Sequence, residues 1–90
     1  MRVVWDPLKA QSNRFKHGLE FEDAATVFYD PLAVTGADPD HSLGELRWIT
    51  FGVSASGQLL TVSHTEEDAI IRIISARQAT RAERHLYEEG

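Results

Sequence analysis

The sequence predicts an α+β fold, in which a small antiparallel β-sheet packs against N-terminal helices and a C-terminal helix. Helix-capping residues occur near both ends of the 90-residue chain, and three apolar runs separated by short turn sequences lie between them. Apolar residues make up 42% of the chain, which is ordinary for a globular protein. We expect one domain over residues 1–90, because a domain usually takes about 100 to 200 residues.

The N-terminal segment predicts a strand followed by a helix. Residues 2–5 form the candidate strand. The helix is expected to begin at Asp6-Pro7, because aspartate is a good N-cap and proline suits the first helical position. It should run to residues 16–17 and end at Gly18, since glycine commonly adopts the left-handed conformation after a helix.

A second, shorter helix is predicted over residues 22–28. Asp30-Pro31 ends it, because the residue before a proline avoids the helical conformation. Residues 32–36 follow as a possible edge strand, and residues 37–44 as a polar loop. At helical spacing the second helix has one apolar face, formed by Phe21, Ala24, Ala25 and Phe28.

Three strands are predicted next, over about residues 45–53, 58–64 and 69–75. Residues 54–57 and 65–68 have the composition of hairpin turns. These turns predict a register that places one set of side chains against the helices as the core. That set is Ile49, Phe51, Leu60, Val62, Ile71 and Ile73.

The opposite face of this sheet is predicted to be amphipathic, with Arg72 among hydroxyl and apolar side chains. Such a face suits contact with a partner or substrate better than contact with water alone. A final helix is expected after Thr80, which with Glu83 forms a capping box. Trp5 is expected in the core.

Charge and composition exclude several classes of protein. The net charge is −5, which excludes a uniformly basic nucleic-acid binder, but residues 1–17 are net basic and residues 18–46 strongly acidic. A local basic face is therefore possible. The chain has no cysteine, no apolar run long enough to span a membrane and no signal-peptide core at its start, so a cytoplasmic location is expected.

Motifs along nearly the whole chain resemble those of BrnT toxins. They are Trp5-Asp6-Pro7 with Lys9 and Asn13, Lys16-His17-Gly18, Phe21, Ala24, Phe28, Asp30-Pro31, Asp40-His41-Ser42, Glu45 with Arg47, Gly52, residues 72–77, Ala79, Glu83-Arg84 and Tyr87. The resemblance implies a RelE-like ribonuclease fold and the toxin half of a type II toxin–antitoxin pair that inhibits translation. It also implies a BrnA-like ribbon-helix-helix antitoxin as partner, through which alone the complex would reach operator DNA. RNA is the implied substrate, with no membrane partner.

RNA cleavage without a metal needs a base for the 2′-hydroxyl proton and cations for the charged phosphorane. Arginine suits the second role because its planar group can hold two phosphate oxygens. Three arginines and two proton-transfer groups are the catalytic candidates, namely Arg47, Arg72, Arg77, Glu45 and His17; Lys16 and Trp48 are the candidates for substrate binding.

Each candidate also has a purely structural interpretation. Glu45 and Arg47, on one strand face, could form only an exposed ion pair, which is worth about 0–1 kcal/mol. His64 is a further acid–base candidate, because the predicted register places it beside Arg47, but it matches no family motif. The four histidines have no metal-site spacing, so no metal or other cofactor is expected.

The chain departs from the family pattern at the second hairpin. Glu66-Glu67 stand where members commonly carry an arginine after Thr65, and Ile70 and Glu20 also depart from the pattern. An acid at this place would repel phosphate. Two alternatives follow: a catalytically weak or inactive toxin homologue that acts as an antitoxin-binding co-repressor, or a small interaction module with no toxin–antitoxin role.

Overall fold

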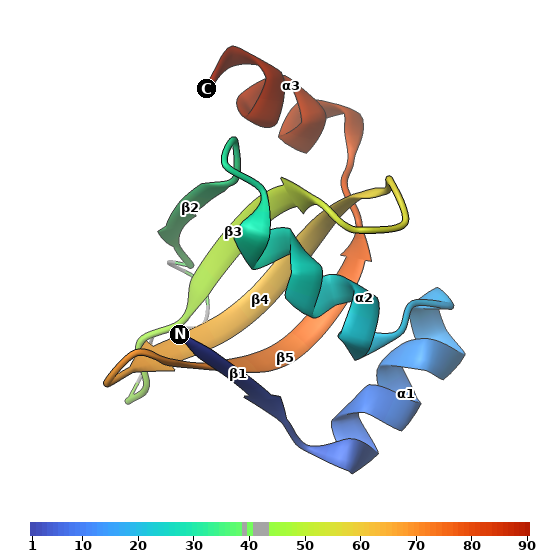
Figure 1. Cartoon of the computed structure of the whole chain (residues 1–90), viewed down its shortest axis with the longest axis vertical. Helices are drawn as coiled ribbons and strands as arrows, with labels where there is room; N and C mark the ends of the chain where they lie inside the picture. The colour runs from blue at the N-terminus through green and yellow to red at the C-terminus, as the bar shows by residue number, and fades with distance from the viewer. Residues whose placement is uncertain (39, 41–43) are drawn as a thin grey trace.

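A computed structural model describes residues 1–38, 40 and 44–90. Its elements, in chain order, are β1 (Arg2–Trp5), α1 (Pro7–His17), α2 (Phe21–Ala25), the 3-10 helix η1 (Thr26–Tyr29), β2 (Val34–Ala37), β3 (Trp48–Val53), β4 (Leu59–Glu67), β5 (Ile70–Gln78) and α3 (Arg81–Glu89). The five strands form one sheet in the order β1-β5-β4-β3-β2 (Figure 1). The predicted α+β class is confirmed, with β1 as one parallel strand in an otherwise antiparallel sheet.

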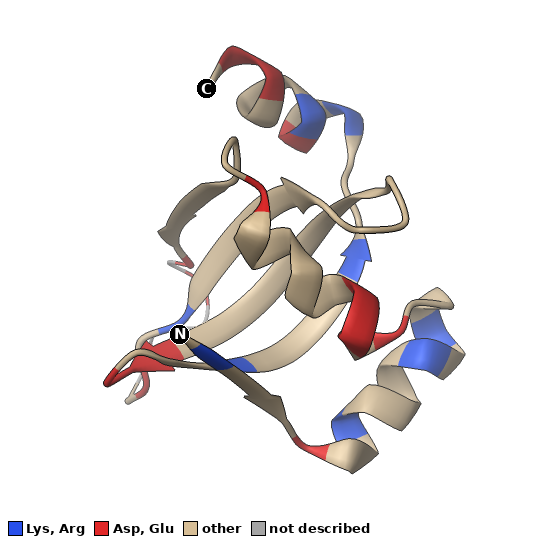
Figure 2. Ribbon diagram, in the orientation of Figure 1, with Lys and Arg blue, Asp and Glu red and all other residues tan. Residues whose placement is uncertain are grey.

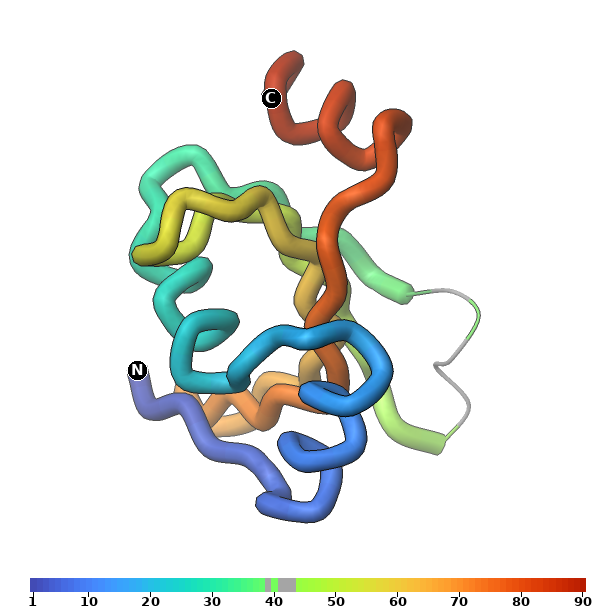
Figure 3. The backbone as a smooth tube through the Cα atoms, turned by 90° about the vertical axis from the view of Figure 1, so that its right-hand side faces the viewer, coloured from blue at the N-terminus to red at the C-terminus, as the bar shows by residue number. Residues whose placement is uncertain are grey.

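The N-terminal helices and the C-terminal helix occupy different parts of the molecule. Buried side chains of α2 and η1 pack against β4 and β5 and form the core, and side chains of β1 and α1 border it. Figure 3 shows α1 and α3 at opposite ends of the molecule, with α3 extending beyond the sheet. The buried apolar cluster is Leu19, Phe21, Ala24, Val27, Leu60, Val62, Ile73 and Ala76.

The predicted helix ends are confirmed by the capping contacts. The Asp6 carboxylate accepts a hydrogen bond from the Leu8 backbone N–H at 2.8 Å. Gly18 follows α1 in the left-handed conformation, with φ of 68°. Thr80 and Glu83 form the reciprocal capping box at the start of α3.

Other boundaries differ from the prediction. The second helix is split into α2 and η1, and the edge strand β2 begins at Val34. Strand β3 begins at Trp48 and not near residue 45, so Glu45 and Arg47 precede it and do not share a strand face. The predicted loop over residues 37–44 lies partly outside the described residues, as does His41.

The predicted register of the β3–β4 hairpin was wrong by one residue. Trp48 lies opposite His64, and Phe51 lies opposite Thr61. The reason is the turn: a backbone hydrogen bond of 2.9 Å from Ser54 N to Gln58 O closes a three-residue loop that ends with Gly57 at φ of 84°. Such a loop carries a glycine bulge, and the extra residue shifts the pairing.

This shift exchanges the faces of β3. Thr50 and Gly52, instead of Ile49 and Phe51, face the N-terminal helices. The two expected core residues of β3 are half-buried on the opposite face. The four expected core residues of the other strands are confirmed as buried: Leu60, Val62, Ile71 and Ile73.

Gly52 is required where β3 crosses η1. A Cβ atom at this position would lie 2.6 Å from Val27 Cγ1 and 3.2 Å from the Val27 carbonyl oxygen. We expect Gly52→Ala to lower the free energy of unfolding by about 1–2 kcal/mol, because overpacking forces a backbone shift. Urea denaturation measures this loss, and Val27→Ala in the same chain should recover part of it. A Gly52→Ala chain as stable as the unmodified one would contradict the packing.

The β4–β5 hairpin is also longer than predicted. Its strands continue to Glu67 and Ile70, and His64 lies opposite Ile73 instead of Ala69. A bulge beside Ser63 and His64 shifts the pairing further along the strands.

A two-residue turn at Asp68-Ala69 closes this hairpin, with φ of 53° and 63°. Both positions favour glycine or asparagine, because a Cβ atom strains the left-handed conformation. We expect Ala69→Gly to raise the free energy of unfolding by up to about 1 kcal/mol. Thermal unfolding measures this gain. Ala55→Gly, in the other hairpin turn, is the control and should give no gain, since Ala55 has negative φ.

Candidate functional site

The end of the β4–β5 hairpin borders a pocket of about 720 Å³, here called the hairpin pocket. Among the described residues, Arg72 is the one cation that lines it, together with four acids: Glu45, Glu66, Glu67 and Asp68. Val4, Leu46 and Ile70 add apolar surface. Figure 2 shows the acidic hairpin tip and the basic bands of α1 at opposite sides of the view.

The structure brings three predicted site residues together beside this pocket. Arg72 donates to the Glu45 carboxylate at 2.7 Å, and Arg47 Nε lies 4.0 Å from the same carboxylate. The side chains of Glu45 and Arg72 are 51% and 41% exposed, so water screens this pair. A phosphate at Arg72 would have to displace Glu45 and approach the hairpin acids.

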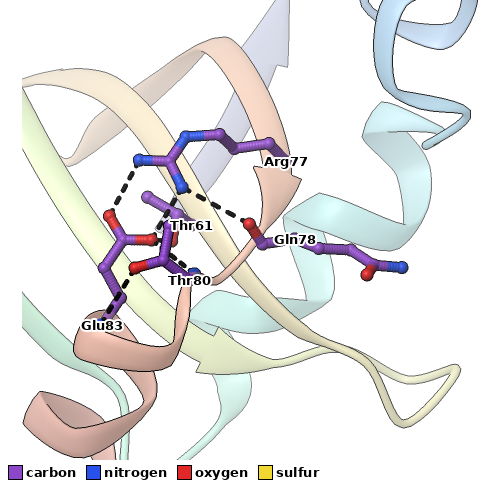
Figure 4. A network of polar contacts seen from close by, with 5 residues as sticks. All are labelled: Thr61, Arg77, Gln78, Thr80 and Glu83. Carbon is purple, nitrogen blue, oxygen red and sulfur yellow. Dashed lines mark hydrogen bonds and ion pairs between the residues drawn. The ribbon is translucent and has the colours of Figure 1, made fainter.

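Arg77 is held by a carboxylate at the other end of β5. Its two terminal nitrogens donate to both oxygens of Glu83, at 2.7 and 2.8 Å (Figure 4). Glu83 also accepts from the Thr61 hydroxyl at 3.0 Å and from the Thr80 backbone N–H at 2.9 Å. These hydrogen bonds, that of Arg77 above all, lower the pKa of Glu83 to about 2. Arg77 therefore anchors α3 to the sheet.

A second depression lies between α1 and β5, with a volume of about 190 Å³, and is here called the α1–β5 groove. Two predicted site residues, Lys16 and His17, line it together with Lys9. None of the described residues that line it carries a carboxylate, and the lining is completed by Ser12, Asn13, Ile74 and Ser75. Among the residues that the structure describes, neither lysine has an acidic partner within 4 Å.

Asn13 fixes α1 at this place. Its side-chain amide donates to the Ala76 carbonyl at 2.9 Å and accepts from the Ala76 backbone N–H at 3.0 Å. The same amide also donates a hydrogen bond of 3.5 Å to the Leu19 carbonyl. Since β1 pairs only with residues 70–73 of β5, Asn13 replaces a strand partner beyond that point. Asn13 was not among the predicted site residues, although a polar residue three positions after Ala10 on the buried helix face was a signal.

His64 is a structural residue. Its side chain is 1% exposed, and its Nε2 shares a 2.7 Å hydrogen bond with the Thr50 hydroxyl, which in turn contacts Thr35 at 2.8 Å. Phe28 packs edge-to-face on the ring. Burial lowers the pKa of His64, which favours the neutral ring. The expectation that it lies opposite Arg47 was wrong, because the register places Trp48 there.

Trp48 is half-buried on β3 and lines neither depression. Its binding role stays a prediction. Within residues 1–38, 40 and 44–90, no group of three or more His, Asp or Glu side chains is arranged to hold a metal ion. No described helix has the length and apolar character needed to cross a membrane.

Comparison with known proteins gives the family. The family model described as the ribonuclease toxin BrnT of type II toxin–antitoxin systems matches residues 5–83. A search of curated proteins found no match. The fold is similar to the 1.1 Å crystal structure of the Brucella abortus ribonuclease toxin BrnT, with a TM-score of 0.64 and 24% identity over 90% of this chain and 99% of that chain. Because the family model covers most of the sequence, this chain belongs to the BrnT family of ribonuclease toxins of type II toxin–antitoxin systems.

Proposed function

We propose that this protein is a metal-independent endoribonuclease that inhibits translation and binds RNA at the α1–β5 groove. One observation carries the proposal: in the described part of the chain, two lysines and a histidine line this groove and no carboxylate does, whereas the predicted arginines Arg72 and Arg77 are each paired with an acid. Family membership supports RNA as the substrate and an antitoxin as the partner.

The groove has the groups that RNA cleavage needs. The 2′-hydroxyl oxygen forms a bond to phosphorus, the bond from phosphorus to the 5′-oxygen breaks, and a proton moves from the first oxygen to the second through the protein or water. His17 is the proton-transfer group, since histidine is the side chain that most often serves as a general acid or base. Lys9 and Lys16 stabilise the charged phosphorane. The products are a 2′,3′-cyclic phosphate and a 5′-hydroxyl.

Cleavage of an end-labelled RNA by the purified chain in the presence of a chelator tests this proposal. His17→Ala and Lys16→Ala should each lower the cleavage rate tenfold or more. Arg84→Ala, which removes an exposed cation on α3, is the matched control and should cleave like the unmodified chain. Full activity of both groove variants would contradict this assignment, and activity lost on Arg72→Ala alone would place the site at the hairpin pocket.

A second candidate function is a catalytically weak toxin homologue that acts as a co-repressor subunit. The favouring observation is the acidic lining of the hairpin pocket, where Glu66 and Glu67 lie together with Arg72. In either case we propose a BrnA-like ribbon-helix-helix antitoxin, through which the complex reaches operator DNA. A small open reading frame of that class directly beside the gene would support this partner.

The Glu67→Arg variant distinguishes the two functions. If loss of the expected arginine has weakened the enzyme, this variant should gain RNA cleavage and toxicity on expression. If the α1–β5 groove is the working site, the unmodified chain cleaves RNA and Glu67→Arg changes its rate little. No cleavage by either chain would contradict the enzyme and leave the co-repressor.

A further inference from the structure

Phe15 on α1 has no packing role in the fold. Its side chain is 92% exposed, the highest value among the exposed large hydrophobic residues of the described chain. Core contacts of α1 are made from the other side of the helix, by Ala10 and Asn13. The structure therefore leaves a complete aromatic ring in water.

Phe15 does not line the α1–β5 groove but lies on a neighbouring face of α1, here called the rim. At about 100° per residue, Phe15 projects roughly 60° around the helix from Ser12 and roughly 100° from Lys16. Both Ser12 and Lys16 line the groove. Leu8, which is 74% exposed, shares this rim because seven residues are close to two turns.

The charged side chains of α1, the helix that carries Phe15, are all basic. Helix α1 carries Lys9, Arg14 and Lys16 and no aspartate or glutamate, in a chain whose net charge is −5. Figure 2 shows basic bands toward both ends of this helix. Glu20, which follows the helix, pairs with Arg14 at 3.5 Å. It does not pair with the two lysines of the groove, so these lysines can bind another anion.

From this juxtaposition we propose that Phe15 stacks on a nucleobase of the single-stranded RNA whose phosphates contact Lys9 and Lys16. Binding of single strands combines a cationic groove with aromatic side chains, because every base offers a π face. The inference rests on the proposed function, since it takes the RNA to lie in the α1–β5 groove. It makes Phe15 a base-binding residue without preference for one base.

A protein contact is the competing interpretation of Leu8 and Phe15. Two apolar side chains give far less area than the roughly 1,000 Å² of a specific protein interface. Cations also flank Phe15 in sequence on both sides, at Arg14 and Lys16, which favours an anionic ligand with aromatic faces.

Fluorescence anisotropy with a labelled 2′-O-methyl oligouridylate, which cannot be cleaved through its 2′-oxygen, tests the stacking. Phe15→Ala should weaken binding about tenfold, within the range found for loss of one stacked base. Phe15→Trp should retain binding. Leu8→Ala is the matched control, because it removes an apolar side chain without a π face from the same rim, and should change affinity less than twofold.

A strand of equal length with abasic sites identifies the contact as one to a base. On this strand, Phe15→Ala and the unmodified chain should bind equally. An equal loss on both strands, or equal effects of Phe15→Ala and Leu8→Ala, would overturn the stacking. If Lys16→Ala weakens binding and Phe15→Ala does not, this inference fails while the proposed site stands, and an apolar contact with protein becomes the explanation. Failure of the unmodified chain to bind any strand would overturn both.

Discussion

Asn13→Ala is expected to lower the free energy of unfolding by about 3 kcal/mol. The substitution removes a buried amide that bonds both backbone groups of Ala76, a residue with no exposed surface. Each buried group left without a partner costs about 1–3 kcal/mol, and two are left here. The loss is larger than for an exposed helix residue, where substitutions stay within about 0.5 kcal/mol.

Urea denaturation at neutral pH measures this loss. Asn13→Asp is the informative companion, because it keeps an acceptor for the Ala76 N–H but places a carboxylate against the Ala76 carbonyl; we expect it to be at least as destabilised. Gln11→Ala, on the exposed side of α1, is the control. An Asn13→Ala chain within 0.5 kcal/mol of the unmodified one would show that Asn13 does not hold α1 to β5.

The same contact determines the geometry of the proposed site. Lys9, Lys16 and His17 belong to α1, whereas Ser75 belongs to β5, and Asn13 joins the two elements between them. Loss of the Asn13–Ala76 contact in Asn13→Ala should therefore reduce RNA binding even under conditions where the chain remains folded. Anisotropy with the oligouridylate, measured well below the unfolding midpoint, separates this effect from global unfolding.

Local signals predicted the helices well. Asp6, Gly18 and Thr80 act through residues at most a few positions away, so their capping roles are visible in the sequence. The exact pairing of the strands was not predictable in the same way. It depends on a glycine bulge at Gly57 and on a turn formed by Asp68-Ala69, which lacks the usual glycine.

In the candidate site, too, local features were predictable from the sequence and contacts between distant residues were not. Lys16 and His17 were predicted from their motif, but the sequence could not show that the predicted Arg72 and Arg77 are paired with Glu45 and Glu83. Those acids lie 27 and 6 residues away in the chain. The role of Asn13 was hidden for the same reason, because its partner Ala76 is 63 residues distant.

Glu83→Gln is expected to lower the free energy of unfolding at pH 7 by about 2 kcal/mol. The carboxylate accepts the two donors of Arg77 together with Thr61 and Thr80, and its pKa falls to about 2 from an ordinary value of 4.5. If the whole pKa difference were converted into free energy at about 1.36 kcal/mol per pKa unit, the expected loss of stability would be larger. The smaller figure allows for solvent screening, since the Arg77 side chain is 40% exposed.

The pH dependence has a definite sign. Because the folded pKa of Glu83 lies below the unfolded one, its contribution to stability is complete above about pH 4.5 and is lost as the pH falls toward 2. The unmodified chain should thus lose more stability over this interval than Glu83→Gln does. Burial tends to raise the pKa of Asp30, but hydrogen bonds from Tyr87 and from backbone groups outweigh this effect and lower it. Asp30 therefore contributes in the same direction in both chains, and its contribution cancels in the comparison.

Glu88→Gln is the matched control, since it neutralises an exposed carboxylate on the same helix α3. Urea denaturation at pH 7 and pH 3 should show a difference for Glu83→Gln only. The comparison also bears on Arg77, because a large Glu83 effect means that the arginine serves to hold α3 and that a phosphate must compete with a carboxylate to reach it. Equal behaviour of the two variants would instead leave Arg77 free to bind RNA and would restore it as a catalytic candidate.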